Sequence, residues 1–221
     1  MTTGKNYRYL FFDLDGTLMK SGEGIERCAQ HALRHFGINI ENLENLRPFV
    51  GPPLEDSFRN FYHLTSEQVH EATRIYGERY ARLGAYEAEP YEGVFNFLQK
   101  MKDAGKVLVL ATSKKIIMAQ RVTEHFKLAP YFDYIGARDE AGTLHTKADV
   151  IRNIIQTLGI ENIQEIVMIG DRKFDIIGAN EVGLDSIGVL YGYGDAEELT
   201  EAGATYLAAD YQELETLLLK N

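Results

Sequence analysis

Short apolar runs alternate along the chain with segments whose apolar residues recur every three or four positions. Such runs are typical of strands buried on both faces of a sheet, and the longer period is typical of helices. The runs are residues 7–12, 107–111, 134–136, 166–169, 186–190 and 205–207, and helical segments follow most of them. This alternation predicts an α/β protein with a Rossmann-like parallel sheet and helices on both faces.

The stretch between the first two strands has a helical pattern only. Apolar residues recur at helical spacing from Ile25 to Phe36, and Thr65 to Gln68 has the pattern of a capping box that opens a second long helix. A short helix is expected between them, after the stiff segment around Pro52. We therefore expect an α/β core of residues 1–18 and 86–221, interrupted by an all-helical domain of residues 19–85.

Composition narrows the class of protein. The 221 residues include 45% hydrophobic and 25% charged residues, which is typical of a globular protein. No apolar run approaches the length of a membrane span, and the first six residues lack a signal-peptide pattern. The single cysteine, Cys28, excludes an intrachain disulfide, and the net charge of -10 argues against nucleic-acid binding. These features predict a cytoplasmic protein with no membrane or nucleic-acid partner.

Two carboxylates, Asp13 and Asp15, directly follow the first apolar run, and Gly16 permits a sharp turn after them. Carboxylates placed together beside a hydrophobic core repel each other and lose hydration, so the pattern predicts a divalent cation. A loop with two solvated aspartates is the simpler alternative. A calcium loop fits less well, because Thr17 and Met19 occupy the next alternate positions and a strand precedes the pair.

Two other strands end in polar residues. Thr112 and Ser113 follow residues 107–111, and Asp171 and Asp175 follow residues 166–169. Each group alone is explained equally well by helix capping or by a turn. Because ligands of parallel sheets gather at the carboxyl ends of the strands, the three groups together predict one functional site.

The order of these motifs resembles that of the haloacid dehalogenase-like hydrolases, and in particular of phosphoglycolate phosphatase-like and 5'-nucleotidase-like phosphatases. The resemblance covers nearly the whole chain. It depends on Asp13-Leu14-Asp15-Gly16-Thr17, Ser113 or Thr112, Lys147, and Gly170-Asp171 with Asp175. It implies that the helical insert is the mobile cap of this family.

The resemblance also implies a role for each matching residue. Asp13 would attack phosphorus and become an aspartyl phosphate, and Asp15 would serve as general acid and then as general base. Mg2+ would bind Asp13, the backbone carbonyl of Asp15, and Asp171, with Asp175 acting through water or by supporting these ligands. Further expected contacts to the phosphate or the substrate are Ser113 or Thr112, Lys147, Gly16, Thr17 and Lys114, with Arg47 and Gly51 in the cap loop.

Some residues depart from the family pattern. Lys20 stands before Ser21 where an acidic residue is usual, and Arg172, followed by Lys173, replaces the usual Thr after Asp171. We interpret the basic pair as solvated, with extra positive charge at the mouth of the site as the alternative. Tyr191 and Tyr193 lie in a glycine-rich stretch after a late strand, where we expect them to pack rather than to act at the site.

The sequence thus predicts a Mg2+-dependent phosphatase that hydrolyses a small phosphorylated metabolite through an aspartyl phosphate. Phosphoglycolate, a nucleoside monophosphate and pyrophosphate all remain open as substrates. A sugar phosphomutase using the same intermediate and a non-catalytic binding protein are the alternatives. A monomer and a homodimer are both compatible with the sequence.

Overall fold

The computed structural model describes residues 5–219. The first four residues, which contributed to the expectation that the chain has no signal peptide, lie outside the described part. The chain divides into two compact units. One unit joins the segment up to Leu18 with the segment from Pro90 onward, and the other is Met19–Glu89. The sequence placed the second boundary after residue 85, and the division by contacts places it after Glu89.

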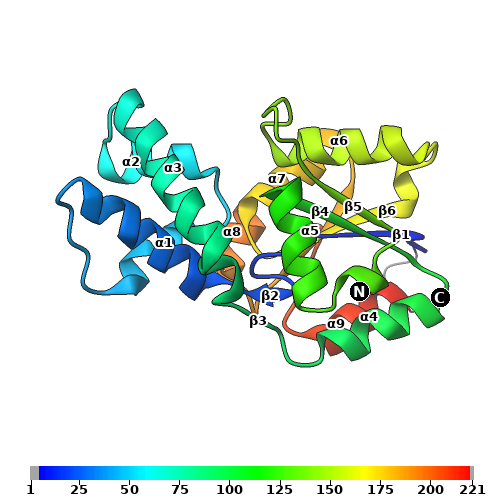
Figure 1. Cartoon of the computed structure of the whole chain (residues 1–221). Coiled ribbons are helices and arrows are strands. Elements are labelled where there is room, and N and C mark those ends of the chain that lie inside the picture. Colours follow the sequence, from blue (N-terminus) through cyan, green and yellow to red (C-terminus); the bar gives the residue numbers. More distant parts are fainter. Residues whose placement is uncertain (1–4, 220–221) are drawn as a thin grey trace. The chain divides into compact units, whose positions relative to one another are not determined.

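The first unit contains a six-stranded sheet in which every neighbouring pair is parallel, in the order β5-β4-β1-β6-β7-β8. This sheet confirms the predicted fold class. Its strands are β1 (Tyr9–Phe12), β4 (Val107–Lys115), β5 (Tyr134–Arg138), β6 (Ile166–Gly170), β7 (Asp185–Val189) and β8 (Tyr206–Ala208). The α-helices of this unit are α4 (Val94–Asp103), α5 (Ile116–His125), α6 (Lys147–Leu158), α7 (Lys173–Val182), α8 (Ala196–Glu201) and α9 (Tyr211–Leu219), shown in Figure 1. Two 3-10 helices, η3 (Ala129–Tyr131) and η4 (Ile163–Glu165), complete its helical elements.

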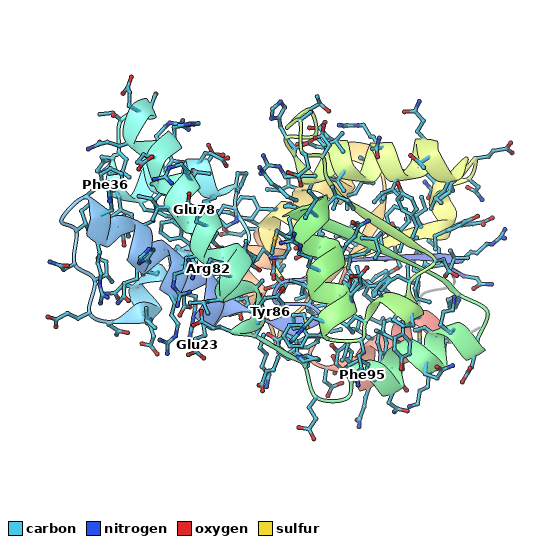
Figure 2. All side chains as sticks on the ribbon, viewed as in Figure 1. Glu23, Phe36, Glu78, Arg82, Tyr86 and Phe95 are labelled. Carbon is cyan, nitrogen blue, oxygen red and sulfur yellow. The ribbon has the colours of Figure 1, made fainter. Side chains whose placement is uncertain are left out.

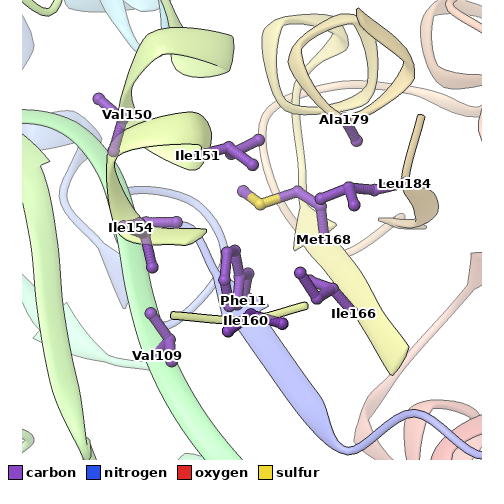
Figure 3. Packing of buried hydrophobic residues seen from close by; sticks show 11 residues of the cluster. Phe11, Val109, Val150, Ile151, Ile154, Ile160, Ile166, Met168, Ala179 and Leu184 are labelled. Carbon is purple, nitrogen blue, oxygen red and sulfur yellow. The ribbon is translucent and has the colours of Figure 1, made fainter. Parts of the chain in front are cut away.

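Strand β1 lies in the middle of the sheet, and its side chains alternate between the two faces. Phe11 is in register with Val109 of β4 and Met168 of β6, and all three belong to a buried cluster with residues of α6 and α7 (Figure 3). Phe12 meets Phe97 of α4 edge to face, with ring centroids 6.0 Å apart. Helices therefore cover both faces, because Phe11 packs with residues of α6 and α7 whereas its neighbour Phe12 packs on α4.

The order of the strands determines where the polar strand ends lie. Strands β1, β4 and β6 are adjacent and parallel, so their carboxyl ends come to the same edge of the sheet. The acidic segment after β1, the end of β4 and the acidic segment after β6 are thereby brought together. The sheet positions the site before any side-chain contact is considered.

The second unit is helical, apart from the two-residue strands β2 (Met19–Lys20) and β3 (Glu89–Pro90) at its ends. The predicted capping box is confirmed, since the Thr65 and Gln68 side chains each accept from the other's backbone N–H. Charged side chains such as Glu78 and Arg82 lie exposed along α3 (Figure 2). Its helical elements are α1 (Gly22–His35), η1 (Leu43–Phe49), α2 (Leu54–Tyr62), α3 (Ser66–Arg82) and η2 (Gly84–Tyr86).

The elements that the sequence did not predict include η1 and α8. The 3-10 helix η1 replaces an expected loop, and it includes Pro48, whose missing N–H a short helix tolerates. Helix α8 is only six residues long, too short to show a period, and its N-terminus is capped by the Asp195 side chain, which accepts from Glu198 N–H at 2.8 Å.

Within residues 5–219, none of the helices is both long and apolar enough to span a membrane.

Candidate active site

Three buried carboxylates meet at the carboxyl edge of the sheet. Asp13 follows β1, Asp171 follows β6, and Asp175 lies in the first turn of α7. One oxygen from each lies within 4.8 Å of the other two. The sequence predicted all three as metal ligands or their supports, and the structure brings them together.

Lys147, at the first position of α6, inserts its ammonium group between two of these carboxylates. Its Nζ donates to Asp13 Oδ1 at 2.7 Å, to the Ala111 carbonyl at 2.7 Å, and lies 2.8 Å from Asp175 Oδ1. An ammonium group has three donors, so these contacts use all of them. The Lys147 stem passes over α7 where a Cβ at Gly178 would crowd it, which explains why a residue without a side chain stands there.

The charges of the cluster do not cancel, because three carboxylates face one ammonium. Burial raises the pKa of Asp13 to about 7, against the opposing attraction of Lys147. Burial, with Asp175 and Asp13 nearby, also raises the pKa of Asp171. Burial alone would lower the pKa of Lys147, but the two carboxylates outweigh it and keep the amine protonated. The site therefore favours an additional cation.

The loop after β1 packs directly on Asp171. Gly16 has φ of +85°, and a Cβ at this position would overlap the Asp171 carboxylate, so both its conformation and its space require glycine. The Thr17 hydroxyl donates to Asp171 Oδ1 at 3.3 Å. Gly16 and Thr17 were predicted to contact substrate, and here they hold the loop of Asp13 against Asp171.

The Asp15 carboxylate lies apart from the three-carboxylate group. Its Oδ2 is 2.8 Å from Lys114 Nζ, and its Oδ1 is buried without a hydrogen-bond partner. Lys114 was expected to contact substrate, and in this structure it pairs with Asp15. Asp13 pairs with Lys147 and Asp15 pairs with Lys114, and this difference is compatible with separate chemical roles for the two carboxylates.

Thr112 and Ser113 lie near the end of β4, next to β1 in the sheet. Thr112 is buried and its hydroxyl oxygen accepts from the Lys114 N–H at 3.2 Å, whereas Ser113 is half-buried. The register of β4 with β5 shifts between Thr112 and Lys115, which places an irregular backbone at this edge. Both residues remain candidates for holding a phosphate oxygen.

The two predicted cap residues lie in the helical unit. Arg47 belongs to η1, and its Nε is 3.8 Å from the carboxylate of Glu26, a buried residue of α1. Gly51 follows η1 with φ of +109°, which favours glycine. Their contribution to substrate binding stays a prediction.

The comparisons with known proteins agree with this geometry. A family model described as haloacid dehalogenase-like hydrolase matches residues 10–189. The chain belongs to this family. The match confirms the family expected from the motifs. Together with the relatives described next, it confirms the expected enzyme class, a phosphatase.

Individual proteins resemble the chain over nearly its whole length. A 5'-nucleotidase from Pseudomonas aeruginosa is 35% identical over 212 residues, which are 96% of either chain. The tyrosine-protein kinase PtkA from Mycobacterium tuberculosis is 31% identical over 217 residues, 97% of this chain and 74% of that protein. The crystal structure of a predicted phosphatase from Clostridium acetobutylicum has a TM-score of 0.94 and 43% identity, and the match covers 97% of this chain and 99% of the other.

The residues of the cluster suit the Mg2+ that this family generally uses. Asp13, Asp171 and Asp175 offer only hard oxygen donors, and Lys147 balances only part of their charge. Mg2+ prefers such carboxylates together with water and phosphate oxygens. The donor set therefore fits the ion. Asp13 and Asp171 are the two carboxylates expected to bind it directly, and Asp175 lies beside them.

Arg172, where this haloacid dehalogenase-like chain departs from the usual Thr, is paired with an acidic side chain and largely buried. Its Nε donates to Glu198 Oε1 at 2.8 Å, and its side chain is only 12% exposed. The Lys173 N–H donates to the same oxygen at 2.9 Å. The interpretation of Arg172 as solvated was therefore wrong, whereas Lys173 is exposed. Extra positive charge at the mouth of the site stays a prediction. Arg172 joins the start of α7 to α8, a helix that the sequence had not revealed.

Two tyrosines at the site were misjudged from the sequence. The Tyr191 hydroxyl donates to the Thr17 carbonyl at 3.1 Å, and the Tyr193 N–H donates to Asp171 Oδ2 at 2.8 Å. Both contacts reach the acidic loops, so the expectation that these residues only pack was incomplete. The Tyr-Gly-Tyr-Gly pattern after a strand was the available signal, since alternating glycines indicate a close approach of backbone to another group.

Proposed function

We propose that this phosphatase hydrolyses small phosphate monoesters with Mg2+ through an aspartyl phosphate on Asp13. The observation that carries the proposal is the buried group of Asp13, Asp171 and Asp175 with Lys147 between two of its members. Phosphoryl transfer requires alignment and charge compensation more than covalent chemistry by the protein. This cluster supplies both.

In the proposed first step, Asp13 forms a bond from a carboxylate oxygen to phosphorus while the ester oxygen leaves with a proton from Asp15. In the second step, water attacks phosphorus, Asp15 accepts its proton, and the bond to Asp13 breaks to release inorganic phosphate. Lys147 holds the Asp13 carboxylate in place at 2.7 Å. Bound Mg2+ would supply positive charge that neutralises the phosphoryl oxygens.

The substrate class is a small phosphorylated metabolite, with nucleoside monophosphates and phosphoglycolate as the first candidates. The 5'-nucleotidase relative, at 35% identity, supports the nucleotide. The resemblance of the motifs to those of phosphoglycolate phosphatases supports phosphoglycolate as the substrate. A phosphate-release screen with Mg2+ over nucleoside monophosphates, phosphoglycolate and pyrophosphate would rank them.

The mechanism is tested with Asp13→Asn, which keeps the shape of the side chain and removes the nucleophile. We expect this variant to lose turnover of p-nitrophenyl phosphate while its circular dichroism spectrum matches that of wild type. Wild-type activity in the purified variant would overturn the mechanism. Incubation with 32P-labelled substrate, followed by acid quenching and peptide mapping, should place the label on Asp13.

The same intermediate could pass its phosphoryl group to an acceptor other than water. Incubation with hexose phosphates distinguishes a phosphomutase, because isomerised sugar phosphate would accumulate in place of free phosphate. The relative named tyrosine-protein kinase makes a tyrosine-containing peptide a second acceptor to include. Neither alternative has a feature of this structure in its favour, so hydrolysis remains the proposal. A cytoplasmic location likewise stays a prediction.

A further inference from the structure

The segment Tyr191–Gly194, between β7 and α8, touches both acidic loops of the site without belonging to either. Its Tyr191 hydroxyl donates to the carbonyl of Thr17, four residues after Asp13, at 3.1 Å. Its Tyr193 N–H donates to Asp171 Oδ2 at 2.8 Å, and its Gly194 N–H donates to the Asp171 carbonyl at 3.2 Å. One short segment thus bonds to the loop after β1 and to the loop after β6.

The carbonyl of Thr17 receives a second phenol hydroxyl from another part of the chain. Tyr211, the first residue of α9, donates its hydroxyl to the same oxygen at 3.1 Å. A carbonyl oxygen has two lone pairs, so the two tyrosines satisfy it completely. Burial raises the pKa of both phenols, which keeps both hydroxyl groups protonated as donors.

The rings that carry these hydroxyls are fixed by aromatic contacts. The centroids of Tyr191 and Tyr211 lie 5.1 Å apart, and Tyr211 stacks on Phe97 of α4 at 4.8 Å. Tyr91 meets Tyr191 edge to face at 5.0 Å. Packed rings keep their hydroxyls in one position, so the Thr17 carbonyl is held by a rigid group.

The two glycines of the segment allow it to approach Asp171. A Cβ at Gly192 would overlap the Asp171 side chain and crowd the Gly16 carbonyl, and a Cβ at Gly194 would overlap the Asp171 carbonyl. Neither glycine has a positive φ, so the requirement is for space. The close approach lets the Tyr193 N–H reach the carboxylate.

We propose that Tyr191–Gly194, together with Tyr211, is a positioning element that fixes the loop of Asp13 relative to Asp171. None of its residues needs to touch substrate. Thr17 links the two tyrosines to Asp171, because its carbonyl accepts from both phenol hydroxyls and its own hydroxyl donates to Asp171 Oδ1 at 3.3 Å. Loss of the element should weaken Mg2+ binding and slow turnover, because both depend on the placement of Asp13 and Asp171. The inference rests on the proposed function.

The first test compares Gly192→Ala with Gly188→Ala. Gly188 lies on β7, and the atoms nearest to a Cβ there would belong to the side chains of Leu199 and Leu207, so this control crowds apolar side chains rather than Asp171. Substitutions beside metal ligands typically weaken metal affinity about 10- to 100-fold. We expect Gly192→Ala to weaken Mg2+ binding, measured by calorimetry in the absence of substrate, about tenfold, and Gly188→Ala to leave it unchanged.

The second test removes only hydroxyl groups and covers the case in which Gly192→Ala does not fold. The double variant Tyr191→Phe/Tyr211→Phe is compared with Tyr7→Phe, whose hydroxyl donates at 2.6 Å to Asp185 at the opposite end of β7. We expect the double variant to weaken Mg2+ binding and to lower kcat several-fold with an unchanged KM for p-nitrophenyl phosphate. Tyr7→Phe should lower the unfolding temperature without either effect.

The outcomes separate this inference from the proposed function. Wild-type Mg2+ affinity and kcat in the folded double variant would overturn the positioning element alone. Equal losses in the double variant and in Tyr7→Phe would also overturn it, since they would indicate general destabilisation. A wild-type protein that neither binds Mg2+ nor releases phosphate would overturn the proposed function and, with it, this inference.

Discussion

Lys114 Nζ lies 2.8 Å from Oδ2 of Asp15, and the two side chains are only 8% and 15% exposed. Asp15 thus has its own cation, whereas Asp13 and Asp175 share Lys147. In the proposed mechanism Asp15 must give a proton to the leaving oxygen, so its orientation matters for the rate. Lys114, the second residue after Thr112 on β4, is therefore placed to position the general acid.

We expect Lys114→Met to slow the hydrolysis of alkyl phosphates about tenfold and to affect p-nitrophenyl phosphate much less. Alkyl leaving groups need a proton donor, whereas p-nitrophenolate leaves without one. Steady-state kcat values for both substrates measure the difference. Lys115→Met is the matched control, because Lys115 is 57% exposed and lies 3.9 Å from Glu140. A loss of equal size for both leaving groups would show that Lys114 does not act through Asp15.

We expect Lys147→Met to destabilise the metal-free protein by about 3 to 5 kcal/mol at pH 7, as removal of one partner of a buried ion pair generally does. The change leaves Asp13 and Asp175 facing each other without their cation. Urea denaturation monitored by circular dichroism measures the free energy of unfolding. The exposed pair of Lys100 and Glu215, at 2.9 Å, provides a control, since Lys100→Met should cost less than about 1 kcal/mol. Equal costs for both substitutions would contradict the stabilisation that we assign to Lys147 between its two buried carboxylates.

We expect the metal-free protein to lose stability as the pH rises from about 4 to about 7. Burial raises the pKa of Asp13 from 3.8 to about 7, so the folded state holds this proton more tightly than the unfolded state. The resulting stabilisation is fully present below the unfolded pKa and is lost as the pH rises through the folded pKa. The raised pKa of Asp171 acts in the same direction.

Mg2+ should reverse this trend, because it binds the ionised carboxylates. Thermal denaturation at pH 5 and at pH 7.5, each with EDTA or with Mg2+, measures the effect. The increase in unfolding temperature caused by Mg2+ should be larger at pH 7.5. An equal increase at both pH values would contradict the link between the cluster and the ion. Asp171→Asn should abolish most of the increase at pH 7.5.

The sequence by itself determined the α/β class and the position of the acidic groups along the chain. Continuous apolar runs mark strands buried on both faces, and β1 and β6 match the runs that end before Asp13 and Asp171. These signals are local, because burial and period act on neighbouring residues. The capping box at Thr65 was predictable for the same reason.

Only the tertiary structure decided which side chains meet. Lys147 reaches Asp13 across 134 positions of sequence, Arg172 pairs with Glu198 on an unpredicted helix, and Tyr191 bonds to Thr17 across 174 positions. These contacts depend on the order of strands in the sheet and on the direction in which each side chain leaves the backbone. Apolar periodicity fixes which residues are buried, but a polar group's partner is set by whichever distant backbone or side chain lies within hydrogen-bond reach after folding.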